Sequence, residues 1–132
     1  MSEKIEAKSE KGAKLKSHED LKVWKDSINL VTEIYRLTKD FPKSELYGLT
    51  NQIRRSAISI PSNIAEGSGR KSKKEYLQFL HVSLGSITEL DTQLIIASNL
   101  EYLSDEDIRT DLLTIKKMLI GLIHSIERKE SK

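Results

Sequence analysis

Four cations lie within five residues near the middle of the chain: Arg70, Lys71, Lys73 and Lys74. Gly67 and Gly69 precede them, and a helix is predicted to begin directly after. Cations are locally unfavourable at a helix N-terminus, the positive end of its dipole, so the cluster indicates a function. Helix amides and glycines beside it favour phosphate binding. The competing interpretation is a solvated, charged loop, and the P-loop pattern G-x-x-x-x-G-K-[ST] is absent.

Other polar residues in residues 54–66 could also do chemistry. Asn63 and Glu66 are three residues apart and therefore share a helical face. A polar network that locks this helix to a neighbour is favoured over acid–base catalysis, since no second carboxylate stands at useful spacing. Arg54 and Arg55 are predicted to pair with carboxylates on a neighbouring helix or subunit, with phosphate contact as the alternative.

His81 offers an alternative reaction, because "HVSLGS" is weakly similar to the motif of histidine phosphotransfer bundles. Gly85 and Ser86 match that motif, whereas Ser83 and Leu84 depart from it, so phosphoryl relay is a minor hypothesis. The three histidines are too scattered for a local metal site. With no cysteine there is no thiolate chemistry and no disulfide. We expect no metal and no cofactor.

The composition is that of one globular domain. The chain has 132 residues, of which 37% are hydrophobic and 32% charged, with a net charge of +2. No apolar run reaches the roughly 20 residues that a membrane span requires. Residues 1–17 predict a flexible polar tail, and residues 18–132 predict the folded domain. The absence of cysteine fits a cytoplasmic location.

Apolar residues recur at spacings of three and four throughout the domain, and no strand alternation is present. Helices are expected at about 19–40, from a Ser44 cap through 45–66, after a Ser72–Glu75 capping box, and from a Ser104 cap to about 129. Gly67 and Gly69 are expected to end the second helix as C-terminal glycines do. Four long helices with short loops predict an all-α, antiparallel up-down-up-down four-helix bundle.

Pro61 falls inside the second predicted helix, where it cannot donate to the carbonyl of Ala57. We expect a continuous helix with a kink, and small residues around the proline that admit a neighbouring helix closely. Ala57 is therefore expected to be buried. The bend is interpreted as a packing feature; the alternative is that it aims Asn63 and Glu66 at a site.

The stretch "QIRRSAISIPSNIAEGSGR", residues 52–70, carries a family resemblance. It resembles the signature of the four-helix-bundle proteins encoded in intervening sequences of bacterial 23S rRNA genes, close to Q-[LI]-R-R-[AS]-A-x-S-[IV]-x-x-N-I-A-E-G. The resemblance covers about Ser17 to Arg128 and implies a ring-like homopentamer, without any established activity or catalytic residue. A distant relative is an accessory nucleic-acid-binding subunit of a retroelement reverse transcriptase. The motif and interface residues it points to are Gln52, Arg54, Arg55, Pro61, Asn63, Glu66 and Gly67.

The predicted topology separates charge along the bundle. One end gathers the tail lysines, Arg70–Lys74 and the C-terminal cations, and the other gathers the acids of residues 101–111. Apolar residues beyond a single stripe, such as Ile58, Ile95 and Ile96, indicate self-association. We therefore predict a non-enzymatic homo-oligomer that binds RNA or DNA through its basic end. The alternatives are a protein-only scaffold and, as a minor one, the His81 relay.

Overall fold

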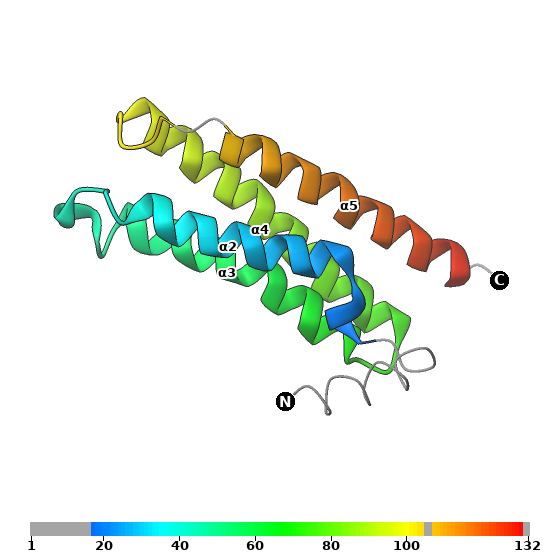
Figure 1. The fold of residues 1–132 in the computed structure, drawn as a ribbon. Helices are drawn as coiled ribbons and strands as arrows, with labels where there is room; N and C mark the ends of the chain where they lie inside the picture. Colours follow the sequence, from blue (N-terminus) through cyan, green and yellow to red (C-terminus); the bar gives the residue numbers. More distant parts are fainter. Residues whose placement is uncertain (1–16, 105–106, 131–132) are drawn as a thin grey trace, which may run out of the picture.

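The computed structural model describes residues 17–104 and 107–130, and all regular structure within them is helical (Figure 1). A short 3-10 turn η1 (His18–Asp20) leads into α2 (Lys22–Thr38), and a second turn η2 (Lys43–Glu45) precedes α3 (Leu49–Ser68). The two longest helices follow, α4 (Lys73–Asn99) and α5 (Asp107–Glu130). The predicted all-α four-helix bundle is confirmed.

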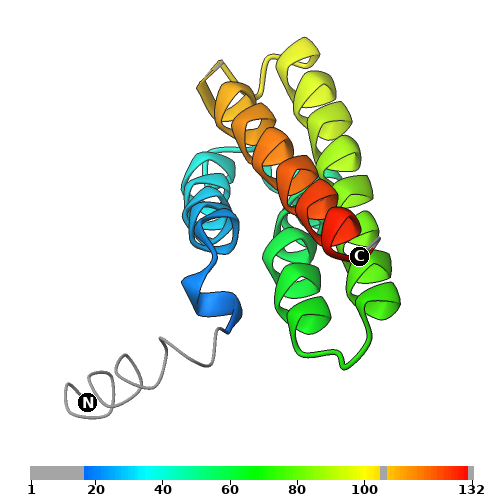
Figure 2. The same ribbon diagram turned by 90° about the vertical axis from the view of Figure 1, so that its right-hand side faces the viewer.

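Successive helices run in opposite directions (Figure 1), as an up-down-up-down bundle requires. The start of α2, the α3–α4 loop and the end of α5 lie at one end of the molecule. The segment around η2 and the α4–α5 connection lie at the other end. Figure 2 views the first of these ends and shows α4 packed beside both α3 and α5.

The core consists of aliphatic residues contributed by all four helices. Ile34 of α2, Ile60 of α3, Leu90 of α4 and Leu119 of α5 are each completely buried or nearly so. Within α5 the buried positions recur at spacings of three and four, namely at Ile108, Leu112, Ile115, Leu119, Ile123 and Ile126. The helical periodicity of the sequence therefore marks the face that each helix turns inward.

Polar contacts between different elements also connect the bundle. The Arg109 guanidinium donates to both oxygens of Asp91, at 2.7 and 3.2 Å, and ties α5 to α4. The Tyr102 hydroxyl, beyond α4, donates to the Glu45 carboxylate in η2 at 3.1 Å. This hydrogen bond to a carboxylate raises the pKa of Tyr102. The bundle is thus also held together by residues outside the apolar core.

The first two helices begin later than predicted. The segment before α2 is a 3-10 turn capped by Ser17, whose hydroxyl accepts from the amide of Glu19 at 3.2 Å. The prediction that the second helix starts at residue 45 was wrong, because residues 43–45 form η2 and α3 begins at Leu49. There the Glu45 carboxylate accepts from the Leu49 amide at 3.2 Å, so an acidic side chain from the preceding turn caps the helix.

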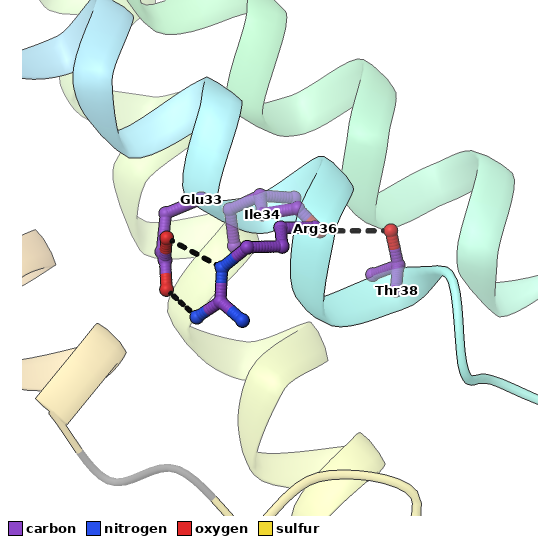
Figure 3. A network of polar contacts seen from close by, with 4 residues as sticks. All are labelled: Glu33, Ile34, Arg36 and Thr38. Atoms are coloured by element: carbon purple, nitrogen blue, oxygen red, sulfur yellow. Dashed lines mark hydrogen bonds and ion pairs between the residues drawn. The ribbon is translucent and has the colours of Figure 1, made fainter.

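The last turns of α2 are held by its own polar side chains (Figure 3). Arg36 makes a two-pronged ion pair with Glu33, and this hydrogen bonding lowers the pKa of Glu33. The buried Thr38 hydroxyl donates to the carbonyl of Ile34 at 2.8 Å. Thr38 thereby satisfies its own donor within the helix and keeps its lone pairs available to a neighbour.

Helix α3 continues without a break through Pro61, and Ala57 is completely buried, as predicted. The kink at Pro61 stays a prediction. The hydroxyl of Ser72 accepts from the Glu75 amide at 3.1 Å, which confirms Ser72 as the cap of α4. The predicted tail and the acids next to the Ser104 cap, at residues 1–16 and 105–106, lie outside the described residues.

Candidate nucleic-acid interface at the α3–α4 loop

The basic cluster lies on and directly after a tight loop of four residues between α3 and α4. The Gly69 amide donates to the carbonyl of Glu66 at 3.3 Å, and the Arg70 amide donates to that of Gly67 at 3.0 Å. Among the described glycines none has a positive φ angle. The prediction that these glycines end the helix is confirmed for Gly69, which is the C-cap of α3 in a right-handed conformation, and is wrong for Gly67, which lies inside α3.

Gly67 serves close packing instead. It lies inside α3 and is buried, and an added Cβ atom would stand 2.8 Å from the Cβ of Phe79 and 3.0 Å from the ring of Tyr76. A side chain at this position would therefore push α4 away from α3. Because Phe79 and Tyr76 lie in the first two turns of α4, Gly67 sets how closely the basic loop can fold.

Arg70 is oriented by two neighbours. Its guanidinium pairs with the Glu66 carboxylate at 2.7 Å and lies over the Phe79 ring, 4.8 Å from the ring centroid. Its side chain is nevertheless 41% exposed. A guanidinium that stacks on an aromatic face still has N–H groups free to donate to a phosphate. Because its side chain is already held in place, it loses less conformational entropy when it binds one.

Lys71, Lys73 and Lys74 are all exposed around Arg70. The exposed cations Arg128 and Lys129, at the end of α5, lie at the same end of the bundle (Figure 1). The exposed acids Glu66, Glu75 and Glu127 reduce the positive charge there, and Glu66 does so by pairing with Arg70. The site is a cluster of exposed cations, which suits an extended polyanion better than an apolar small molecule.

The two adjacent arginines of α3 differ in their surroundings. The Nε of Arg54 donates to the Thr38 hydroxyl at 2.9 Å, and its guanidinium lies 4.5 Å from the centroid of the Tyr35 ring. Within the chain Arg54 thus contacts a hydroxyl and a ring of α2 where a carboxylate of a neighbouring helix was predicted, and pairing with a carboxylate of a neighbouring subunit stays a prediction. Arg55 is exposed on the outer side of α3. Of the two, Arg54 is the one that contacts the rest of the bundle.

A chain of hydrogen bonds joins α3 to α4 at the small residues. The Asn63 amide donates to the hydroxyl of Ser59 at 2.9 Å, and that hydroxyl accepts from Ser86 at 2.7 Å. Nearby, the buried Ser83 hydroxyl donates to the carbonyl of Ile60 at 2.9 Å. The predicted network that locks this helix to its neighbour therefore includes Asn63. Glu66 instead pairs with Arg70.

Sequence reasoning missed both serines of α4. Ser83 and Ser86 are three residues apart, and each is followed by core residues at helical spacing. Small polar residues within the apolar stripe of α4 could have indicated from the sequence that another helix packs closely there. Gln52, the first residue of the family motif, is exposed on α3, one helical turn before the buried Ser56.

The histidines of the described part of the chain lie apart from these contacts. His81 is exposed on α4, and the His18 ring packs edge-on against Trp24 with centroids 4.9 Å apart. Among residues 17–104 and 107–130, no three histidine or acidic side chains are placed to share a metal ion. Within the same ranges, none of the helices has the length and apolarity to cross a bilayer.

The helix order and the α3 motif agree with a known family. The family model described as "23S rRNA-intervening sequence protein" matches residues 19–121. The chain belongs to this family. The matched range contains every motif residue from Gln52 to Gly67 and the whole basic loop, so the resemblance based on residues 52–70 is confirmed.

A solved structure extends the comparison to the fold. The chain is similar to a crystal structure from Bacteroides thetaiotaomicron, described as a protein with unknown function from the S23 ribosomal protein family. The two share 28% identity with a TM-score of 0.71, covering 76% of this chain and 97% of the other. A comparison with curated proteins found no match. Neither the family nor the neighbour is named for an enzymatic activity.

Proposed function

We propose that this protein is a non-enzymatic, cytoplasmic binding module that contacts the backbone of RNA or DNA through the α3–α4 loop. The observation that carries the proposal is the placement of Arg70 on the Phe79 ring beside the exposed Lys71, Lys73 and Lys74. Four neighbouring cations can neutralise several phosphates of a nucleic-acid backbone, and each neutralised phosphate releases counterions, which favours binding.

The binding is expected to have little sequence preference. Reading of base edges requires an element that fits a groove and presents hydrogen-bond donors or acceptors. The loop is short and its lysines are point charges, and the nearby ring of Phe79 lies under Arg70. Stacking of bases on this surface is therefore weak, and phosphate contacts dominate.

Self-association belongs to the same proposal. The family resemblance implies a homopentamer, and exposed apolar residues such as Ile58 and Ile96 indicate that the helices have surface to bury between copies. Five copies arranged with their basic ends together would multiply the local positive potential. Light scattering is expected to give the mass of five chains; the mass of one chain would contradict the oligomer.

The nucleic-acid proposal is tested by replacing Arg70, Lys71, Lys73 and Lys74 with glutamine. The parent is titrated with labelled duplex and single-stranded oligonucleotides of several sequences between about 50 and 200 mM salt. The variant is expected to bind every sequence more weakly and to show a flatter dependence on salt. The log–log slope should fall by about one for each phosphate that the variant no longer neutralises.

The matched control removes the same charge elsewhere, with Lys39, Lys43, Lys116 and Lys117 replaced by glutamine. These lysines lie neither in the α3–α4 loop nor at the C-terminal end of α5, which is at the same end of the bundle as the loop. The control is expected to retain most of the affinity and the salt slope, whereas both variants keep the parent mass. Binding that survives the loop variant, or a parent that does not bind at low salt, would favour a protein-only scaffold.

A further inference from the structure

The outer face of the α2–α3 pair carries an apolar groove that no described part of the chain fills. It has a volume of about 330 Å³ and is built around Pro61, with Trp24, Ile28 and Val31 on α2 and Ile58 and Ala65 on α3. Ile28 and Ile58 are 38% and 41% exposed at its opening. Burial of these side chains would remove apolar surface from water without any change in the bundle.

Helix α4 also carries exposed apolar side chains. Val82 and Ile96 are 53% and 44% exposed, although α4 also supplies buried core residues along its whole length. Val82, Glu89 and Ile96 follow one another at intervals of seven residues and therefore lie on one line along the helix. A second surface that covered this line would bury apolar side chains that the bundle itself leaves in water.

The charges at these two surfaces are complementary. Arg55 is exposed one turn before Ile58 on the groove side of α3. Glu89 is exposed midway along the line from Val82 to Ile96. The two α2 acids nearest the middle of that helix, Asp26 and Glu33, line a different groove, which faces α5. One cation, Arg55, thus lies beside the α2–α3 groove, and one acid, Glu89, lies within the α4 line.

We propose that the α2–α3 groove receives the Val82–Ile96 line of α4 from a second copy of this chain, with Arg55 of one copy against Glu89 of the next. The inference rests on the self-association in the proposed function and assigns its interface. Each copy has both a groove and an α4 line, and the groove of one copy contacts the line of the next. The contact is therefore heterologous, since it joins two different surfaces. Such contacts propagate from copy to copy instead of giving a two-fold dimer, and they form a closed ring when the rotation between copies closes, as in the proposed pentamer.

The test uses two variants of the full chain, Ile58→Asp in the groove and Ile96→Asp on α4. Each places a charge on one surface only, at a side chain that is already partly exposed, and circular dichroism checks that the helices persist. Each variant alone is expected to lose the mass of the parent assembly in light scattering. Leu113→Asp is the control, since Leu113 is 41% exposed on α5, outside both surfaces, and it is expected to keep the parent mass.

Mixing the two variants identifies the type of interface. Ile58→Asp retains an intact α4 line and Ile96→Asp retains an intact groove, so an equimolar mixture is expected to form a complex of two chains joined by one contact. The exposed pair gives a second measurement: Arg55→Glu and Glu89→Arg are each expected to weaken assembly, and the double variant is expected to restore it.

The outcomes separate this inference from the proposed function. An assembled parent whose Ile58→Asp and Ile96→Asp variants keep its mass, or a mixture that stays monomeric, would overturn the assigned interface alone. A monomeric parent would overturn the interface together with the oligomer. Loss of oligonucleotide binding in the loop variant is measured independently and is unaffected by either result.

Discussion

Gly67 is the residue whose role differs most between the sequence and the structure. Its position near the end of a predicted helix is typical of a glycine that ends a helix. In the structure it lies within α3, and its missing side chain makes room for Phe79 and Tyr76 of α4. The same residue type serves two different purposes, and only the path of the neighbouring helix distinguishes them.

Gly67→Ala is expected to lower the free energy of unfolding by about 1–3 kcal/mol, because the added methyl group overpacks the α3–α4 contact. Urea denaturation measures the change. Gly121→Ala is the matched control: no atom lies within 4 Å of a Cβ added there, and the site is inside α5. It should gain up to about 1 kcal/mol from helix propensity. Equal effects at both sites would contradict the close-packing role.

Tyr76 makes stability depend on alkaline pH. Burial raises its pKa above that of a solvated phenol. Its contribution to stability is complete below the unfolded-state pKa of about 10 and is lost as pH rises through the folded-state value. Tyr76→Phe is expected to flatten the fall of the unfolding free energy above about pH 10, measured by urea denaturation. Tyr47→Phe, at a side chain that is 92% exposed, should leave the profile of the parent.

At the scale of the elements, Thr38 connects α2 to α3 through Arg54. Thr38→Val keeps the shape of the side chain but removes the acceptor for the Arg54 Nε. We expect a loss of about 1–3 kcal/mol in unfolding free energy, the cost of leaving a partly buried charged donor without its partner. Thr114→Val is the control, because its exposed hydroxyl donates to the carbonyl of Thr110 in its own helix. A loss no larger than that of the control would show that Arg54 relies on the Tyr35 ring.

The elements themselves were largely predictable from sequence. Spacings of three and four indicated four helices, and Ser72 correctly marked the start of α4. The start of α3 was not predictable from these signals, since the η2 turn and the Glu45 cap depend on how the chain folds back. The cations of the loop were identified from their types alone. The support of Arg70 by Phe79 was missed, because that contact crosses the loop.

The whole molecule is unevenly packed. Helices α3 and α4 meet through small residues such as Ala57, Gly67 and Ser83 and are joined by hydrogen bonds. Helices α2 and α5 are separated along part of their length by a groove of about 350 Å³, lined by Asp26, Glu33 and Asp111. Close packing and buried hydrogen bonds raise the free energy of local opening, so the two halves of the bundle should differ in stability.

Native-state hydrogen exchange should reveal this difference. The amides in the middle of α3 and α4 are expected to exchange only through global unfolding, whereas those of α2 that border the groove should exchange through smaller openings and therefore faster. The comparison is made at low denaturant concentration, where the two routes separate. Equal protection in all four helices would contradict an uneven bundle.

The hydrogen bonds from Ser83 to Ile60 and from Ser86 to Ser59 also limit where residues can be inserted or deleted in α3 and α4. They fix the rotational phase of α4 against α3, and one residue inserted within either helix would turn everything beyond it by about 100°. The four-residue loop between the helices is where added or deleted residues disturb that phase least. A change in length is therefore expected to be tolerated best in the segment that carries the cations, so the cationic surface could change while the bundle stays the same.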